Sequence, residues 1–334
     1  MIRTIDSGEH IIVYDPVWAS TGILITDSKL VRLLHSTPVN NLKYLSQNGS
    51  SNFIKTPFGK KSLLSKITRY DHSVGCMVLA LRVSTTLDDT AIDNAIVALL
   101  HDVMHLPFSH TIDHLLGTES ESYHETHKTE LLEKYAEEFI DILGSGWKKY
   151  FKEENFPTVK LNNPFAIDVC DYTARDLYHI GFIDDKIVQK CLLFTTVEDG
   201  YLKCSNDKTV KLWKKLSKMI NDNMYTAAWN MADNHYFSES IREMMDAGEV
   251  SKEEIINYKE DTETKIYEKI KHIFSKKVKD KKFLLLIADS YDRSVYTKIK
   301  SMRVRYRYMN PTLLREMPKK SDGLFVNLDL VYWN

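Results

Sequence analysis

Residues 91–113 read AIDNAIVALLHDVMHLPFSHTID, and the nearly continuous apolar run at the start of this stretch ends in His101-Asp102. Such a run is typical of a buried helix, which we expect to stop near Pro107 because proline lacks the amide hydrogen that a helix interior requires. A carboxylate at the end of a buried helix needs a partner, since an isolated charge in a dry interior is very unfavourable. Asp102 therefore binds a cation or belongs to a hydrogen-bonded His–Asp pair.

Histidines gather around this stretch. The sequence has 12 histidines, and seven of them lie between positions 72 and 127. These seven are His72, His101, His105, His110, His114, His124 and His127. Because imidazole is a common metal ligand and a general acid or base near neutral pH, the cluster marks the region in which to look for a site.

One motif in this stretch points to a different enzyme class. HDVMH, residues 101–105, is similar to the zincin motif HExxH, in which the glutamate acts as a general base through a water molecule. Asp102 is one methylene shorter than glutamate, and Pro107 follows His105 by two residues. Both differences disfavour a zincin protease.

Helical patterns continue on both sides. Thr68-Arg69-Tyr70-Asp71 fits a capping box for a helix that carries His72 in its first turn, and Ser122-Tyr123-His124-Glu125 fits a second box. Asn163-Pro164 predicts the start of a further helix, and Gly181 its end.

The helix expected from Pro164 to Gly181 has one polar face. It carries Asp168, Asp171, Tyr172, Arg175 and His179. Taken alone, this face is either functional or a solvated surface with an Asp171–Arg175 ion pair.

The remaining patterns predict a mainly α protein. Residues 11–18 form a short strand, 28–36 a helix, 194–204 a hairpin around Asp199-Gly200, and 207–278 further helices. Strand candidates follow at 283–289, 301–309 and 323–333. We divide the chain into an N-terminal segment that packs on the core (1–60), a helical core (61–245) and a C-terminal α+β region (246–334).

Composition excludes several classes of protein. Net charge is −1, so no strong overall field attracts nucleic acid or a membrane. The four cysteines form no CxxC pair, and there is neither a signal peptide nor a run of 18 apolar residues. We expect a cytoplasmic homo-oligomer without a membrane partner. Alternation in 301–309 places Arg303, Arg305 and Arg307 on one face, and we interpret this strand as solvated or subunit-facing rather than nucleic-acid-binding.

Four stretches carry a family resemblance. TRYDHSVG (68–75), LLHDVMHLPFSHTID (99–113), YHETH (123–127) and DVCDYTARDLYHIGF (168–182) resemble, in order and spacing, the HD-domain phosphohydrolases. They are most similar to the branch of the sterile-alpha-motif/HD-domain deoxynucleoside triphosphate triphosphohydrolases and their bacterial relatives. VYDPVW, NLKYLSQNG and RVRYRYMNP resemble further segments of that branch. The resemblance implies an HD-domain helical core with a short N-terminal strand, a small hairpin and a minor C-terminal α+β region.

The resemblance also implies a metal site and catalytic residues. One divalent cation would be held by His72, His101, Asp102 and Asp168. Two imidazoles and two carboxylates suit Mn, Fe, Ni, Zn or Mg. His124 matches the family's catalytic histidine, which transfers a proton to the leaving oxygen, and Glu125 matches the acid that orients it.

Other matched positions concern the substrate and the support of the metal ligands. Arg69 and His110 match phosphate contacts, Gln47 a sugar contact, Tyr172 a tyrosine that helps to exclude a 2′-hydroxyl, and Asp176 an acid at the 3′-hydroxyl. The candidates to orient the metal ligands are His105, Asp113, Asp171 and Arg175.

These matches predict a metal-dependent nucleotide phosphohydrolase that resembles the deoxynucleoside triphosphate triphosphohydrolases. Two departures favour an alternative, a phosphomonoesterase (nucleotidase) acting on nucleoside monophosphates or another small phosphate ester. Val169 stands where the triphosphate enzymes have a lysine, and no arginine occurs between Arg175 and Arg242. A triphosphate carries about four negative charges, for which arginine is the usual partner. A further alternative is a nucleotide-binding regulatory module without turnover.

The N-terminal segment predicts that guanine nucleotides do not activate the protein. In the triphosphate branch this segment binds such an activator, but here Ile11 and Tyr14 stand where polar contacts are expected. We expect turnover and oligomeric state to be unchanged by GTP or dGTP, measured by product release and light scattering. Stimulated turnover or GTP-driven tetramer formation would contradict this.

Overall fold

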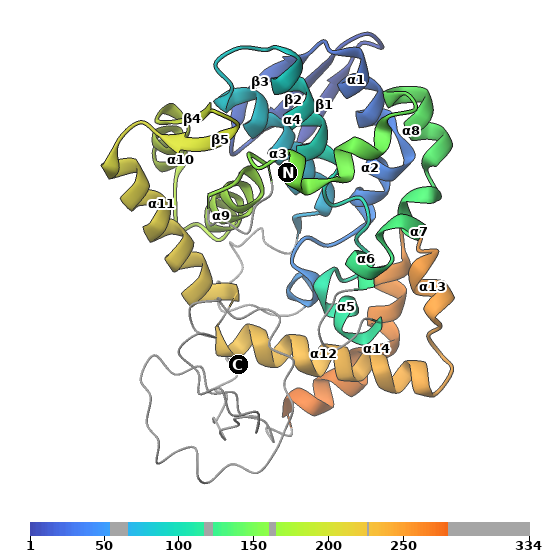
Figure 1. The fold of residues 1–334 in the computed structure, drawn as a ribbon. Helices are drawn as coiled ribbons and strands as arrows, with labels where there is room; N and C mark the ends of the chain where they lie inside the picture. The colour runs from blue at the N-terminus through green and yellow to red at the C-terminus, as the bar shows by residue number, and fades with distance from the viewer. Residues whose placement is uncertain (54–65, 117–122, 160–164, 226, 280–334) are drawn as a thin grey trace.

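The computed structural model describes residues 1–53, 66–116, 123–159, 165–225 and 227–279, and it is mainly helical (Figure 1). The described part also holds a three-stranded antiparallel sheet near the N-terminus and a two-stranded hairpin. This confirms the predicted fold class. The predicted strands after residue 280, with their arginine stripe, lie outside the described residues.

The N-terminal sheet is larger than predicted. β1 (Arg3–Asp6), β2 (Ile11–Asp15) and β3 (Ala19–Ile25) pair in that order, where the sequence analysis expected one strand. β1 is exposed along its length and β3 faces solvent in part, so neither carries a strong apolar alternation. Along β2, buried residues alternate with partly exposed ones. Asp15 is the last of the three buried residues, and its side chain is fully buried.

The core helices begin close to the predicted places but end differently. α1 (Ser28–His35) and α2 (Thr37–Asn41) lead to α3 (Arg69–Val83), which starts with the predicted capping box between Thr68 and Asp71. α4 (Asp89–Leu100) packs along α3 and ends at Leu100, well before Pro107. His101 therefore caps the helix, and Asp102 lies just beyond it in a turn.

The helices after α4 are short. α5 (His110–Leu116) precedes the predicted capping box at 122–125, whose first residue lies outside the described residues, and α6 (Tyr123–Thr126), α7 (Lys128–Glu133) and α8 (Ala136–Leu143) follow.

The next helix, α9 (Ile167–His179), starts later than the predicted Asn163-Pro164. Its N-cap is Ala166, without a side-chain cap, and Gly181 follows its end with φ of 81° as expected.

The remaining elements complete the described chain. α10 (Asp185–Leu193) precedes the predicted hairpin of β4 (Thr195–Glu198) and β5 (Tyr201–Cys204), whose turn at Asp199-Gly200 has positive φ at both positions as a type I′ turn requires. α11 (Asp207–Ile220), a π-helical turn (Asn221–Tyr225), α12 (Ala228–Asp246), α13 (Lys252–Ile256) and α14 (Thr262–Lys279) follow.

α12 packs against both α5 and α14. The domain boundaries proposed at 60 and 245 remain predictions. None of the helices in the described ranges has the length and apolar character needed to span a membrane.

A buried ion network joins α3, α9 and the N-terminal sheet. Arg175 donates to Asp15 at 2.7 Å and to Asp171 at 2.8 and 2.9 Å, and all three side chains are fully buried. The guanidinium passes directly over Gly75 of α3. A Cβ at that position would lie 1.8 Å from Arg175 Nη2, so only glycine leaves room. The Asp171–Arg175 pair is thus a core interaction and not part of a solvated face.

Gly75→Ala should therefore destabilise the fold strongly. The added methyl must displace Arg175 and leave two buried carboxylates without their counter-ion, a loss of about 3 kcal/mol or more. Urea unfolding followed by circular dichroism measures it. Gly146→Ala is the matched control, because nothing lies within 4 Å of its Cβ position and its φ is −85°. Equal unfolding free energies for the two variants would show that the network does not need Gly75.

Candidate metal centre

Three elements bring the four predicted ligands together. His72 comes from the first turn of α3, His101-Asp102 from the end of α4, and Asp168 from the first turn of α9. The two Nε2 atoms of His72 and His101 are 3.2 Å apart. Asp168 Oδ1 lies 3.2 Å from the former and 3.6 Å from the latter, and the Asp102 oxygens lie 3.6 and 3.4 Å from them.

Hydrogen bonds at the far side of each ring set the tautomers. His72 Nδ1 lies 2.8 Å from Asp171 Oδ2, and His101 Nδ1 lies 2.8 Å from the carbonyl oxygen of Ala98. Because these partners only accept, each Nδ1 carries the hydrogen. In neutral rings both Nε2 atoms then present lone pairs, and they face each other and two carboxylates. Such an arrangement requires positive charge between the four groups.

The field of the site favours a cation. Burial alone would raise the pKa of Asp102, but Arg69 and His101 outweigh it and hold that pKa well below its usual value. For Asp168, burial alone would likewise raise the pKa, but the neighbouring imidazoles of His101 and His72 outweigh it and lower that pKa. Burial lowers the pKa of His72, whereas Cys76, Asp168 and Asp171 raise it, and the net shift is upward. Both acids are therefore ionised, ready to bind a proton or a metal.

The spacing fits a metal ion. Ligand bonds of about 2.1 Å in tetrahedral or octahedral arrangement keep neighbouring donors about 3.0–3.4 Å apart. The observed separations of 3.2–3.6 Å are close to this range. The His72–Asp171 hydrogen bond is the carboxylate–histidine contact typical of metal ligands. The four side chains thus fit one divalent cation.

Cys76 lies near the same place. The ligand atoms of His72, Cys76 and His101 are all within 4.8 Å of one another, so these three could also hold a metal ion. Cys76 Sγ is 3.7 Å from His72 Nδ1 and 3.8 Å from Nε2, a nearly equal distance that places it away from the Nε2 lone pair. Burial also raises the pKa of the thiol. The two carboxylates are therefore the better partners for the histidines.

Arg69 lies against the metal centre. Its Nη1 donates to Asp102 Oδ2 and its Nε donates to Ser109 Oγ at 2.9 Å, and the side chain is buried. Arg69 is predicted from the sequence to contact phosphate. In the structure its guanidinium pairs with Asp102, one of the predicted metal ligands.

A second cluster of imidazoles adjoins Asp102. The His105 ring lies 4.2 Å from that of His124 and 4.9 Å from that of His110, between centroids. His105 Nε2 is 3.2 Å from Asp102 Oδ1, and its Nδ1 is buried without a hydrogen-bond partner among the described residues. Burial, with Arg69 and His124 nearby, lowers the pKa of His105 well below its usual value. The side chains of Glu125 and Asp113 lie outside the described part.

The opposite side of the centre is built on one face of α9. Asp168, Tyr172 and Asp176 recur every four residues, and the Tyr172 ring lies 6.5 Å from that of His72. Asp176 accepts from Asn48 at 3.3 Å and from the Tyr225 hydroxyl, and burial raises its pKa to about 6.

Gln47, the residue before Asn48, has a buried Oε1 without a partner among the described residues. Of the predicted sugar-contacting residues, Tyr172 and Asp176 share one face of α9, and Gln47 is next in sequence to the Asn48 that contacts Asp176.

Several residues of these clusters were missed from sequence. Tyr225 reaches Asp176 from a π-helical turn, and its ring meets that of Tyr172 at 5.6 Å and 80°. Trp18 Nε1 donates to Asp171. Asp15 lies in the predicted strand but was not predicted to belong to the site, although its place in the alternating β2 sequence marks it as an inward residue. For Trp18 and Tyr225 no local pattern indicates the contact.

Comparisons with known proteins support the superfamily in which such a centre is expected. Residues 69–175 match the HD domain family. The metal-dependent phosphohydrolase cns2 of Cordyceps militaris is 34% identical over 182 residues, which are 54% of this chain and 49% of that protein. The uncharacterized protein YdhJ of Bacillus subtilis is 29% identical over 183 residues, 52% of this chain and 51% of that one. This chain thus spans about half the length of these curated relatives.

A solved structure shares the fold. A phosphohydrolase from Bacteroides thetaiotaomicron superposes with a TM-score of 0.56 at 20% identity, covering 71% of this chain and 60% of that one. Residues 69–175 are similar to the HD domain family, and the matches support a place in the HD superfamily. The matched segment contains all four predicted ligands.

Metal binding by substituted proteins tests the ligand set. We expect wild type to bind one Co²⁺ per chain and Asp168→Ala to bind it about 100-fold more weakly or worse, because a direct ligand is lost. Cys76→Ser should retain the affinity. Dialysis with metal analysis and visible absorption measure these. A sulfur-to-cobalt charge-transfer band in wild type that disappears in Cys76→Ser would contradict the two-carboxylate set.

Proposed function

We propose that the protein is a metal-dependent phosphohydrolase acting on a nucleotide, with His72, His101, Asp102 and Asp168 holding one divalent cation. The observation that carries this is the convergence of four acceptor groups, next to three imidazoles on one side and a tyrosine–aspartate cluster on the other. The similarity to the metal-dependent phosphohydrolase cns2 supports the reaction class.

The cation and the imidazoles have separate tasks. When bound, the cation polarises the phosphorus centre and lowers the pKa of the attacking water. His124, packed against His105, donates a proton to the leaving oxygen. His105 lies between Asp102 and His124. Its Nε2 donates to Asp102, and its lowered pKa keeps the ring neutral, so it adds no repulsive charge. Arg69 keeps Asp102 ionised and oriented toward the cation.

The cluster on α9 binds the sugar. Tyr172 offers an aromatic face near His72, and Asp176 offers a carboxyl group fixed by Asn48 and Tyr225. A carboxyl held in this way can accept a hydrogen bond from a 3′-hydroxyl, and the packed tyrosines leave less room beside the ring for a 2′-hydroxyl. A deoxynucleotide is the substrate that this pairing favours.

The charges around the site favour a monophosphate. Arg69 is already paired with Asp102, and Val169 adds no charge beside Asp168. Arg242 pairs with Glu239 on the surface, and Lys186 and Lys190 are exposed on α10. A triphosphate needs several cationic partners. The triphosphohydrolase reaction, which family proximity favours, is the second candidate.

A substrate panel with metal removal tests the proposal. We expect purified protein with Mn²⁺ or Co²⁺ to release orthophosphate from deoxynucleoside monophosphates, to lose activity in EDTA, and to regain it when metal is restored. His124→Ala should lower kcat by about 10²–10⁴-fold, the usual contribution of a general acid. His35→Ala, on the exposed end of α1, is the control and should leave kcat unchanged.

Other outcomes separate the alternatives. Tripolyphosphate release from deoxynucleoside triphosphates supports the second candidate. Nucleotide binding without any phosphate product supports a regulatory module. Turnover that persists in EDTA at the wild-type rate would overturn a metal-dependent mechanism.

A further inference from the structure

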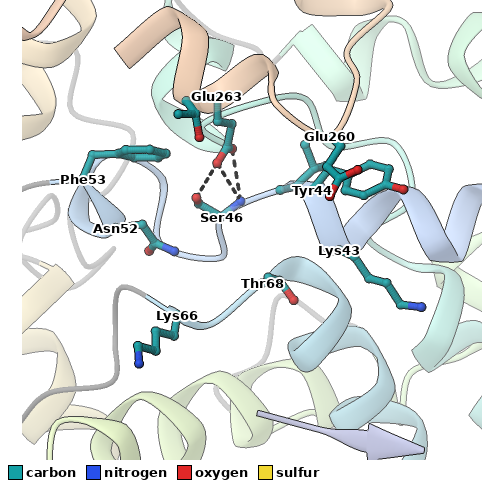
Figure 2. A pocket seen from close by; sticks show the side chains of 11 residues that line it. Lys43, Tyr44, Ser46, Asn52, Phe53, Lys66, Thr68, Glu260 and Glu263 are labelled. Atoms are coloured by element: carbon teal, nitrogen blue, oxygen red, sulfur yellow. Dashed lines mark hydrogen bonds between the residues drawn. The ribbon is translucent and has the colours of Figure 1, made fainter. Parts of the chain in front are cut away.

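Glu263 is a buried carboxylate that ties the C-terminal helices to the loops of the metal centre. It lies in the first turn of α14 and is 5% exposed. Its oxygens accept hydrogen bonds from Ser46 N at 3.1 and 3.2 Å, from Ser46 Oγ, and from Phe108 N at 2.6 Å. Figure 2 shows the carboxylate reaching from its helix to Ser46. These partners lie 217 and 155 residues away in the sequence, so the contact is wholly tertiary.

The chemistry of this contact calls for an acid. The three donors come from neutral groups, and burial raises the pKa of Glu263 to about 7, so the charge is held at a cost. Both carboxylate oxygens of Glu263 accept hydrogen bonds. A glutamine would turn its NH₂ group against the amide hydrogen of Ser46 or Phe108. The loop beside Ser46 also borders a cavity of about 470 Å³, so hydrogen bonds rather than dense packing fix it there (Figure 2).

The loop that Glu263 holds has an unfavourable backbone. Phe108 and Ser109 have φ of 60° and 50°, the left-handed region that non-glycine residues rarely adopt. Two such residues in a row persist only where their surroundings hold them. The carboxylate accepts from the first of the two amides, and Gly49 packs closely against the Phe108 carbonyl, since a Cβ there would lie 2.7 Å from that oxygen.

A short chain of contacts leads from this loop to the metal ligands. Ser109 Oγ donates to the Ser46 carbonyl at 2.8 Å and accepts from Arg69 Nε at 2.9 Å. Arg69 Nη1 then donates to Asp102. A backbone hydrogen bond also connects Arg69 to this loop: Arg69 N donates to the carbonyl of Leu45, the neighbour of Ser46, at 2.8 Å. Moving Ser46 or Ser109 therefore moves the guanidinium that faces Asp102.

We propose that Glu263 is a positioning residue for the metal centre: it fixes Ser46 and the Phe108-Ser109 turn, which hold Arg69 in place against Asp102. The inference rests on the proposed function only in taking Asp102 as a metal ligand. It makes the C-terminal helices α13 and α14 part of the machinery of the HD domain, although the family match ends at Arg175. The contact with Glu263 would also explain how Phe108 and Ser109 keep their unfavourable backbone conformation.

A double-mutant cycle with Co²⁺ as the probe tests this inference. Glu263→Gln and Ser109→Ala should each weaken Co²⁺ binding about tenfold and alter the visible Co²⁺ spectrum, the scale usual for groups that orient a ligand. Because both act through Arg69, the double variant should lose little more than either single variant. Glu260→Gln, an exposed acid just before α14, is the matched control and should bind Co²⁺ like wild type.

The outcomes are distinct. Wild-type affinity and spectrum in Glu263→Gln, or fully additive losses of about 100-fold in the double variant, would overturn the inference. If circular dichroism shows that Glu263→Gln does not fold, Ser46→Ala, which removes only the hydroxyl donor, is tested in its place. An altered visible Co²⁺ spectrum in Ser46→Ala supports the inference, and an unchanged one overturns it. Failure of wild type to bind Co²⁺ or to release phosphate would instead overturn the proposed function.

Discussion

Four acceptor groups that face one point in a buried space cannot coexist without positive charge between them, and this requirement organises the structure. His72, His101, Asp102 and Asp168 come from the ends of three helices, where side chains can turn toward a common centre. The far nitrogen of each ring is held by an acceptor, Asp171 or the Ala98 carbonyl, so the rings cannot turn away. The helix ends are therefore fixed in position as much by electrostatics as by the apolar core.

The same requirement extends outward in two directions. Behind His72, Asp171 is balanced by Arg175, which is balanced in turn by Asp15 of the N-terminal sheet. Beside Asp102, Arg69 is supported by Ser109, Ser46 and finally Glu263 of α14. On the first side each buried charge meets an opposite charge, and on the second side neutral hydrogen-bonding groups connect Arg69 to Glu263. The site thus reaches both the N-terminal segment and the C-terminal helices.

Much of the core was predictable because its patterns are local. The capping box at Thr68, the type I′ turn at Asp199-Gly200 and the apolar run before His101 depend on neighbours in sequence, and the structure contains all three. Contacts between distant segments left no such pattern. Trp18 reaches Asp171, Tyr225 reaches Asp176, and Glu263 reaches Phe108 across 155 residues. The early end of α4 also follows from tertiary demands, because on a continued helix the adjacent side chains of His101 and Asp102 would point about 100° apart and could not reach one centre.

The two sides of the centre differ in charge, and that difference bears on the substrate. On the Asp102 side, Arg69 is neutralised by its partner and burial keeps His105 uncharged, so the described groups there favour proton transfer over strong anion binding. On the Asp176 side, a carboxyl with a pKa of about 6 sits among tyrosines and an amide, a setting suited to hydroxyl groups. The proposed substrate, with one phosphate and a hydroxyl-bearing ring, suits both sides. A longer phosphate chain would meet fewer compensating charges among the described residues, and for this reason the charges of those residues, more than the metal ligands themselves, bear on the choice between the two candidate reactions.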